Sequence, residues 1–276
     1  MENFGGMEMD ILQKEGSEQL RIKKWEKQHP GLYAGFTTRN GGKSIGPYDT
    51  LNMGMHVKDT YENVIDNRRH LAKLISFPVD TWVSGQQTHQ TNIHIVHAAD
   101  KGKGAVDFET SIPKTDGLIT NEKGVLNTAF FADCVPLFFF DPVSGYIGIA
   151  HAGWKGTVAG IGEKMVKTFI RLGVDISSLL AVIGPCITTP YYEVDEQVVS
   201  KIDLAFKEYV TERTDNNRFL FDLKKLNKEI LCQAGISEMN IDVTDYCTYR
   251  HSETFFSHRR DSGKTGRMLG FIGYHS

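Results

Sequence analysis

The sequence has few of the features that mark secreted, membrane or nucleic-acid-binding proteins. It contains 4 cysteines in 276 residues and no Cys-x-x-Cys pair, so a disulfide framework is not expected. The longest apolar run, residues 135–140, is far too short to span a membrane. The first 20 residues are polar and acidic and do not resemble a signal peptide. The net charge of −3 gives no electrostatic reason to bind nucleic acid or an anionic membrane. We therefore expect a cytoplasmic protein with reduced thiols that binds neither.

The bulk composition is that of an ordinary globular protein. Hydrophobic residues make up 40% and charged residues 24%, which is typical of a chain with a packed core. No internal repeat, low-complexity tract or linker divides the sequence. Residues 1–20 lack a clear period and are expected to form a loosely ordered leader. Residues 21–276 are expected to form a single domain that carries any catalytic site.

The hydrophobic periods predict a mixture of helices and short strands. Helical spacing covers residues 61–75, 157–172, 195–210 and 223–234. Short apolar runs that read as strands cover residues 32–36, 81–84, 93–96, 126–131, 137–140, 146–150, 180–183, 241–243 and 268–272. Residues 141–145 have the composition of a hairpin turn. This order favours an α+β fold with more than one sheet layer.

Three potential metal ligands stand at the ends of predicted strands. They are His89 in Gln-Gln-Thr-His, Cys134 in Ala-Asp-Cys-Val-Pro and His151 in His-Ala-Gly-Trp-Lys-Gly-Thr. If the middle strands form a meander, the strand ends beside Cys134 and His151 would be neighbours. One Cys and two His make a three-ligand zinc set with an open fourth position, the pattern of catalytic zinc sites. A single His or Cys is more often a packing or surface residue, so the spacing alone leaves a shared site open.

Two residues next to these ligands carry charge. Asp133 could orient a ligating imidazole or act as a general base, or it could simply cap a turn. Lys155 lies in a glycine-rich turn that enters a predicted helix, where backbone N–H groups attract anions. The same turn would also serve as an ordinary helix cap. It is not a nucleotide-binding P-loop, because the Gly-x-x-x-x-Gly-Lys-Ser/Thr pattern is absent.

Four arginines and one further cysteine complete the candidates. Guanidinium groups bind phosphate or carboxylate through two parallel hydrogen bonds, although most arginines are solvated surface residues. The arginines of interest lie in turns, on a helix or near the C-terminus: Arg39, Arg68, Arg259 and Arg260. Cys186, in a tight Gly-Pro-Cys turn, is a second thiol of interest.

The ordered motifs of the chain resemble those of the YfiH/YlmD family, which is labelled laccase-like polyphenol oxidoreductase and is also recognised as a family of purine nucleoside phosphorylases. The resemblance begins near residue 31. It rests on Thr-Thr-Arg-Asn-Gly-Gly (37–42), Gly-Pro-Tyr-Asp-Thr-Leu-Asn-Met-Gly (46–54), Asn-Arg (67–68), Gln-Gln-Thr-His (86–89), Thr-Asp-Gly (115–117), Ala-Asp-Cys-Val-Pro (132–136), His-Ala-Gly-Trp-Lys-Gly-Thr (151–157), Gly-Pro-Cys-Ile (184–187), Tyr-Glu-Val (192–194), Cys-Thr (247–248) and Phe-Phe-Ser-His-Arg-Arg-Asp (255–261).

The resemblance implies a fold, a metal and a reaction. The fold would be a layered αββα sandwich similar to the catalytic domain of cytotoxic necrotizing factor toxins. The zinc ligands would be His89, Cys134 and His151. The implied reactions are the cleavage of adenosine, inosine and methylthioadenosine by phosphate, and the deamination of adenosine. The partners would then be a purine nucleoside and phosphate. The protein would be a monomer or a homodimer.

The resemblance also assigns candidate roles and shows departures from the usual family pattern. The catalytic candidates are Asp133, Arg39 and Cys186. The candidates for substrate and phosphate binding are Asn52, Arg68, Lys155, Arg259 and Arg260. Three positions depart from the common residue: Lys155 replaces Arg, Gln90 replaces Gly and Ala132 replaces Thr, and the chain also lacks the extra Cys that some relatives carry after Gly-Pro-Cys-Ile. None of the three is a proposed ligand, so the departures bear on substrate preference and on the roles of Lys155 and Cys186.

Two other enzyme classes remain open. A Cys/His₂ site could take copper, because copper(II) outcompetes zinc for such ligands, and weak polyphenol oxidase activity would follow. A true multicopper oxidase needs His-x-His pairs, which this chain lacks. A second alternative is an amide hydrolase acting on a cell-wall precursor, with Cys134 as nucleophile. A non-enzymatic metal-binding protein is disfavoured, because the polar motifs converge on one site.

Overall fold

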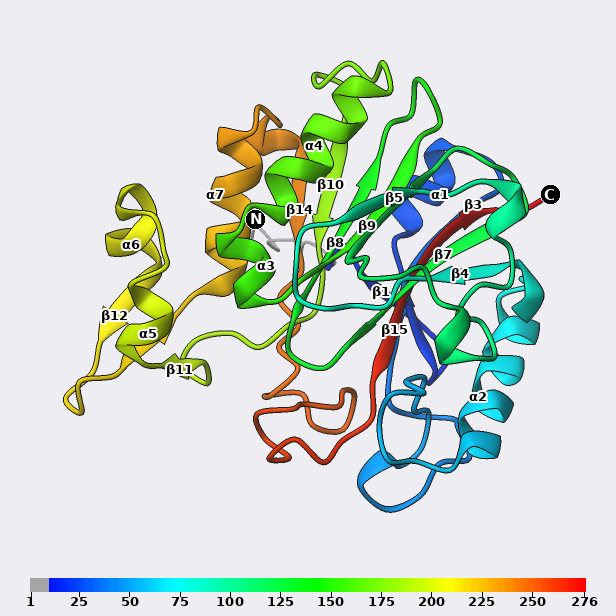
Figure 1. Ribbon diagram of the computed structural model, residues 1–276, viewed down its shortest axis with the longest axis horizontal. Helices are drawn as coiled ribbons and strands as arrows, with labels where there is room; N and C mark the ends of the chain where they lie inside the picture. The colour runs from blue at the N-terminus through cyan, green and yellow to red at the C-terminus, as the bar shows by residue number, and fades with distance from the viewer. Residues whose placement is uncertain (1–9) are drawn as a thin grey trace, which may run out of the picture.

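The computed structural model describes residues 10–276, which build two large sheets, one small sheet and helices on the outer faces (Figure 1). Within that range the first sheet has the order β1-β2-β3-β15-β7-β4. Its strands are β1 (Gln13–Glu15), β2 (Gln19–Arg21), β3 (Leu32–Thr37), β15 (Met268–Tyr274), β7 (Val125–Phe131) and β4 (Trp82–Ser84). The C-terminal strand β15 pairs antiparallel with both β3 and β7, so the two ends of the described chain meet in one sheet.

The second sheet carries the strand ends that hold two of the predicted ligands. Its order over the described residues is β14-β10-β8-β9-β6-β5. The strands are β14 (Ile241–Val243), β10 (Leu180–Ile183), β8 (Val135–Phe140), β9 (Ile147–Ala152), β6 (Gly117–Thr120) and β5 (Ile93–Ile95). Strands β8 and β9 form an antiparallel hairpin through the predicted turn at residues 141–145. The predicted hairpin is therefore confirmed, but the three middle strands do not form one meander, because β7 lies in the first sheet.

Helices and a small third sheet complete the fold. The helices are α1 (Lys23–Gln28), α2 (Tyr61–Leu74), α3 (Trp154–Val158), α4 (Ile161–Arg171), α5 (Glu196–Val199), α6 (Leu204–Val210) and α7 (Leu223–Gln233). Short 3₁₀ turns occupy Gly46–Tyr48, Val79–Thr81, Ala98–Asp100, Phe108–Thr110 and Glu238–Asn240. The third sheet pairs β11 (Glu193–Val194), β13 (Phe219–Phe221) and β12 (Thr211–Arg213), and it projects from the body together with α5 and α6 (Figure 1). The sequence analysis did not predict this sheet.

Alternation along the strands explains why the two large sheets stack. In β8, Phe138 and Phe140 pack into the core between the sheets, whereas Leu137 and Phe139 pack on the opposite face with residues of α4 and α7. Side chains alternate across a strand, so one short apolar strand can serve two cores.

The first sheet shows the same arrangement. Phe131 of β7 faces the core between the sheets, and Phe130 packs outward with Leu71 of α2. The layers are therefore α4 and α7, the second sheet, the first sheet and α2 (Figure 1). The predicted α+β class is confirmed.

Helix ends agree with the sequence in two cases and differ in two. Helices α2 and α7 match the predicted ranges within a residue, and Asp222 caps α7 by accepting the Lys225 N–H, as predicted. The single helix expected over residues 157–172 was wrong: the chain breaks between α3 and α4 at Gly160, whose φ of +84° favours glycine. The helix expected over residues 195–210 is also two helices, because Asp203 starts α6 by accepting the Ala205 N–H. The apolar period continues across both breaks and hides them.

The expected leader, residues 1–20, lies partly outside the described residues. Nothing is described for residues 1–9. From residue 10 onward the chain is built into the first sheet through β1 and β2, with Leu12 and Leu20 buried in the core between the sheets. These two apolar anchors are too far apart to produce a visible period, which is why the sequence alone indicated loose order.

In the part of the chain that the structure describes, no helix combines the length and apolarity that crossing a membrane requires.

Candidate metal centre and pocket

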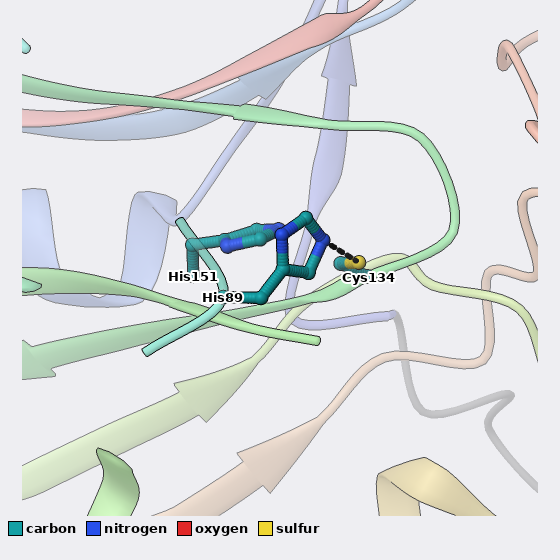
Figure 2. A group of neighbouring side chains, drawn as sticks. All are labelled: His89, Cys134 and His151. Carbon is teal, nitrogen blue, oxygen red and sulfur yellow. Dashed lines mark hydrogen bonds between the residues drawn. The ribbon is translucent and has the colours of Figure 1, made fainter. Parts of the chain in front are cut away.

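His89, Cys134 and His151 come together at one point of the fold (Figure 2). Their ligand atoms all lie within 4.8 Å of one another, and the Cys134 Sγ is 3.8 Å from the His89 Nε2. The two imidazole rings meet edge to face, with centroids 4.7 Å apart. A tetrahedral zinc ion with Zn–S of about 2.3 Å and Zn–N of about 2.0 Å holds such atoms roughly 3.5 Å apart. The spacing therefore fits one shared ion.

The hairpin of the second sheet brings two of these ligands together. Pro136 of β8 pairs with His151 of β9, and Val135 pairs with Ala152. Cys134 lies one residue before β8, so its thiol reaches the same end of the hairpin as the His151 ring. His89 arrives on the loop between β4 and β5 and has a left-handed φ of +58°. Three separate segments thus supply the three ligands.

One buried carboxylate lies behind the two histidines. The Asp116 side chain is 0% exposed. Its Oδ1 accepts hydrogen bonds from the His151 Nδ1 at 2.9 Å and from the His89 backbone N–H at 3.1 Å. Its Oδ2 accepts the backbone N–H groups of Thr88 at 3.1 Å and Gln90 at 2.9 Å. Burial raises the pKa of Asp116, but these donors, led by His151, bring it below the ordinary value.

The thiol and imidazole of the cluster favour their charged forms. Burial opposes the Cys134 thiolate, but the charges and hydrogen bonds of His151 and His89 outweigh burial and lower the pKa of Cys134 to about 6. Burial likewise opposes a charged His151, yet the Cys134 thiolate and Asp116 raise the pKa of His151 to about 9. Each of the two side chains therefore favours the charged form of the other.

Close packing at Gly153 shows how tightly the cluster is built. A Cβ at this position would lie 2.7 Å from the His89 Cδ2 and 3.0 Å from the Cys134 Sγ, closer than side-chain atoms tolerate. Only glycine lets the backbone approach both ligands. A soft thiolate and two imidazoles are the donors that zinc and copper prefer, so the cluster could bind a metal ion of this type.

The cluster lines a pocket of about 540 Å³. Three cationic side chains share this pocket: Lys155, Arg259 and Arg267. None of them forms an ion pair with a carboxylate of residues 10–276. Aromatic side chains and histidines supply much of the remaining wall, including His56, Phe108, Phe130, Trp154 and Tyr192. The pocket thus combines a candidate metal centre, uncompensated positive charge and flat apolar surfaces.

Asp133 lines the pocket, and three donors hold its carboxylate. It accepts hydrogen bonds from the Thr248 hydroxyl at 2.6 Å, the Ser257 hydroxyl at 3.0 Å and the Arg259 backbone N–H at 2.7 Å. It is 8% exposed and has a left-handed φ of +84°. The carboxylate therefore holds the C-terminal loop and the backbone of Arg259 against the ligand cluster.

The two adjacent arginines of the C-terminal loop point in different directions. Arg259 lines the pocket, with its guanidinium 5.1 Å from the centroid of the Tyr192 ring and one N–H donated to the Glu193 carbonyl at 2.7 Å. Arg260 instead pairs with Asp261 at 2.9 Å and donates to three backbone carbonyls of its own loop. Of the pair, only Arg259 is placed to meet a ligand.

Four other predicted site residues do not line the pocket. The Arg39 side chain donates to the carbonyls of Asp49 and Ser252, and Asn52 is buried under the backbone of Arg267. Cys186 is 0% exposed, its thiol donates to the Ile187 carbonyl, and burial raises its pKa to about 12.

Arg68, the fourth of these residues, is also 0% exposed. Its guanidinium donates to the carbonyls of Met53, Gly104 and Ala105. Arg39, Asn52, Arg68 and Cys186 therefore bond to backbone groups around the pocket and are not among the residues that line it.

Sequence reasoning missed the aromatic wall of the pocket, including Phe108, Phe130 and Tyr192, and three charged or titratable residues of the site. Asp116 stands in the Thr-Asp-Gly motif, which was used for the resemblance but given no role. Arg267 is a charged residue directly before the apolar run of β15, and His56 follows the Gly-Pro-Tyr motif by several residues. An isolated Arg beside a buried strand was the available signal for Arg267. Nothing in the local sequence distinguishes His56.

The stacked sheets, the helices on their outer faces and the pocket with its His–Cys–His cluster define the class: a mixed α+β protein with a candidate single-ion metal centre. The family described as "Multi-copper polyphenol oxidoreductase laccase" matches residues 33–275, and the chain belongs to this family.

Relatives and solved structures confirm the resemblance drawn from the motifs. "Purine nucleoside phosphorylase YlmD" of Bacillus subtilis is 42% identical over 92% of this chain and 94% of its own. The protein of the same name from Geobacillus stearothermophilus is 42% identical over 96% of this chain and 97% of its own. The crystal structure of YlmD from Geobacillus stearothermophilus, at 41% identity, has a TM-score of 0.91 and covers 97% of this chain and 100% of that one. That of Bacillus licheniformis YfiH, at 40% identity, has a TM-score of 0.93 and covers 96% of this chain and 100% of that one.

Proposed function

We propose that this protein is a zinc-dependent purine nucleoside phosphorylase that also deaminates adenosine. One observation carries the proposal: the three-ligand cluster, with room for a fourth ligand, opens into the same pocket as three uncompensated cations. The relatives named purine nucleoside phosphorylase support it. The proposed substrates are adenosine, inosine and methylthioadenosine together with phosphate.

The cations are suited to phosphate. Phosphate carries close to two negative charges near neutral pH, and the three cationic side chains that line the pocket offer it charge-assisted hydrogen bonds. Lys155 follows the Gly153 turn beside the ligands, Arg259 sits over Tyr192, and Arg267 precedes β15. We assign phosphate binding to these three residues, in place of Arg68 and Arg260.

The aromatic side chains are suited to a purine ring. His56 packs near both Phe108 and Phe130, with ring centroids 5.9 Å apart in each pair, and all three line the pocket. Flat rings of this kind stack on a purine and exclude water from the glycosidic bond. A volume of about 540 Å³ accommodates a nucleoside and a phosphate together.

The protein's own groups would hold the reactants and move one proton. In phosphorolysis a phosphate oxygen bonds to the ribose C1′ while the bond from C1′ to the base nitrogen breaks, and the base takes up a proton as it leaves. The Tyr192 phenol lines the pocket; burial raises its pKa, which keeps it protonated but makes it a weaker acid. The Arg259 guanidinium, 5.1 Å from the ring centroid, would stabilise the phenolate that proton transfer leaves. We assign the proton to Tyr192 for this reason, because the buried Cys186 does not line the pocket and the Asp133 carboxylate is held by Thr248, Ser257 and Arg259.

Zinc, when bound by His89, Cys134 and His151, would supply a Lewis acid that orients phosphate or lowers the pKa of a bound water to about 7 for deamination.

The test uses purified protein with its metal content measured. Inosine and phosphate should give hypoxanthine and ribose 1-phosphate, and omission of phosphate should leave inosine intact. Methylthioadenosine should be cleaved in the same way, and adenosine should release ammonia without phosphate. Folded, zinc-loaded protein that forms neither a free base nor ribose 1-phosphate would refute the phosphorylase proposal.

Copper chemistry is the second candidate, favoured by the description of the family. Over residues 10–276, one cluster of His, Cys, Asp or Glu side chains is arranged to hold a metal ion, and it has three members. One site with a single thiolate does not match the several copper ions of a multicopper oxidase. The test measures both activities against the bound metal. If oxidase activity rises with copper content while phosphorolysis rises with zinc content, the oxidase reaction results from copper taking the place of zinc. The third candidate is an amide hydrolase that acts on a cell-wall precursor. This reaction would require Cys134 to be a nucleophile and not a metal ligand.

We also propose that the single catalytic domain expected over residues 21–276, extended by β1 and β2, acts in a reducing cytoplasm. The pocket draws its walls from both large sheets and from the C-terminal loop, so no smaller segment contains it. All four cysteines are free thiols, as a thiolate ligand requires.

A further inference from the structure

Among residues 10–276, Asp116 is the one carboxylate whose hydrogen bonds reach two of the three candidate ligands. It bonds the ring of His151 and the backbone of His89 through the same oxygen, Oδ1. We infer that Asp116 is a positioning residue that sets the His151 tautomer and the His89 loop together, so that both imidazoles face one metal ion. The inference rests on the metal centre of the proposed function and is independent of the nucleoside reaction.

The first part of the inference concerns the His151 ring. An ionised carboxylate only accepts hydrogen bonds, so the His151 Nδ1 must donate the proton at 2.9 Å. In the neutral ring the lone pair is then on Nε2, which belongs to the ligand cluster. A metal-binding His commonly donates its other N–H to a carboxylate for this reason. Asp116 is fully buried, so water does not compete for this bond.

The second part concerns the loop that carries His89. Three consecutive backbone N–H groups, those of Thr88, His89 and Gln90, point at the two oxygens of Asp116. This wrapping accompanies the left-handed φ of +58° at His89, a conformation that non-glycine residues rarely adopt. The backbone of His151 is tied to the same residue, because its N–H donates to the Asp116 carbonyl at 2.8 Å.

An amide cannot replace this carboxylate. Each oxygen of Asp116 faces two N–H donors, so the NH₂ of an asparagine must meet N–H groups on whichever side it takes. If the NH₂ faces His151, it donates to Nδ1 and drives the ring proton onto Nε2, the ligand atom. If it faces Thr88 and Gln90, it repels the loop that carries His89. Both orientations disturb a ligand.

Asp133 provides a matched control. It is also a buried aspartate next to the cluster, but two of its three partners are the hydroxyls of Thr248 and Ser257. Hydroxyl groups can reverse their hydrogen bonds to suit an amide, and none of the partners is a ligand. Asp133→Asn should therefore leave metal affinity close to that of the parent.

The experiment measures zinc affinity by competition with a chromogenic chelator, and cobalt(II) absorption as a probe of ligand geometry. We expect Asp116→Asn to weaken zinc binding about 10- to 100-fold and to change the cobalt(II) spectrum. Asp133→Asn should stay within about 3-fold of the parent, and His151→Ala should show the loss caused by removing a ligand. Circular dichroism of the metal-free proteins verifies folding. A folded Asp116→Asn protein with parental affinity and spectrum would overturn the inference.

A second measurement needs no variant and decides the question if Asp116→Asn does not fold. In zinc-loaded protein labelled with ¹⁵N-histidine, His151 should carry its proton on Nδ1 and the metal on Nε2. A proton on Nε2, or metal on Nδ1, would overturn the inference. Neither experiment uses a nucleoside, so a parent protein that binds zinc through this network but cleaves no nucleoside would refute only the proposed function.

Discussion

Arg68 and Arg267 contact the same short segment, residues 52–54, but they serve different ends. Arg68 donates its hydrogen bonds to the carbonyls of Met53, Gly104 and Ala105 and is 0% exposed. Arg267 is fixed through its backbone to the Asn52 side chain; its Nη1 donates to the neighbouring carbonyls of Thr265 and Gly266, and the residue still lines the pocket. The two regions, the Arg68 cluster (Asn52, Asn67 and Arg68) and the pocket, contain similar residue types.

The difference lies in which hydrogen-bonding groups are already paired. In the Arg68 cluster the side chains satisfy backbone groups of neighbouring loops; Asn67, for example, donates to the carbonyls of Thr50 and Asn52. In the pocket the thiolate, the imidazoles and the cations face a common volume. A polar residue in a family motif thus indicates function only when its donors or charge remain available. The Arg68 guanidinium, 4.7 Å from the Phe130 ring, also supports the pocket wall from behind.

The largest expected effect comes from removing a ligand in the pocket. Cys134→Ser should lower zinc content from about one ion per chain to near zero and abolish phosphorolysis, since the hydroxyl is a far weaker zinc ligand than a thiolate. Metal analysis after gel filtration and a base-release assay test this. Cys232→Ser, on α7 and outside the pocket, is the matched control and should retain both properties. Full zinc occupancy in Cys134→Ser would instead favour a nucleophilic Cys134.

The next largest effect should fall on stability and come from the Arg68 cluster. Arg68→Met would leave the buried carbonyls of Met53, Gly104 and Ala105 without donors, at about 1–3 kcal/mol for each unpaired group. We expect a loss of at least about 3 kcal/mol in the free energy of unfolding, measured by urea denaturation of the metal-free protein. The folded fraction should still bind zinc. An Arg68→Met protein of normal stability that fails to bind phosphate would reverse the roles assigned to the two regions.

The same contrast shows how far the sequence could be read. It predicted the α+β class, the hairpin and the three side chains that meet in the cluster, because strand-end positions and a Cys/His₂ set are local signals. It could not separate Arg259 from Arg260 or Arg267 from Arg68, because the partner that satisfies a guanidinium is remote in sequence. Asp116 was missed for the same reason. The donors that its carboxylate accepts from lie in the loop at residues 88–90 and at His151 of β9, which are remote in sequence. The break at Gly160 was missed because the apolar period runs through it.

A smaller effect should separate the pocket cations from other arginines. Arg267→Met removes one charged donor from the proposed phosphate site, and a hydrogen bond to a charged group is worth about 1.5–3 kcal/mol. The KM for phosphate should therefore rise about 10- to 100-fold, with zinc content unchanged. Arg69→Met, which alters an exposed arginine on α2 beside Arg68, is the control. Steady-state kinetics at varied phosphate test this, and equal KM values for the two variants would remove Arg267 from the site.

The last comparison needs no substitution. It sets the reactivity of the pocket thiol, Cys134, against that of the buried thiol, Cys186. In metal-free protein, His151 and His89 lower the pKa of Cys134 to about 6, whereas burial raises the pKa of Cys186 to about 12. A thiol reacts as its thiolate, so alkylation of Cys134 by iodoacetamide should increase as the pH rises through about 6 and level off above pH 7. Cys186 should stay unmodified in the folded protein, and added zinc should protect Cys134. Peptide mapping by mass spectrometry gives both rates. If the alkylation rate of Cys134 instead has its pH midpoint near the ordinary pKa of a thiol, the imidazoles do not stabilise the thiolate. The pocket and the interior would then not differ in their electrostatic effect on a thiol.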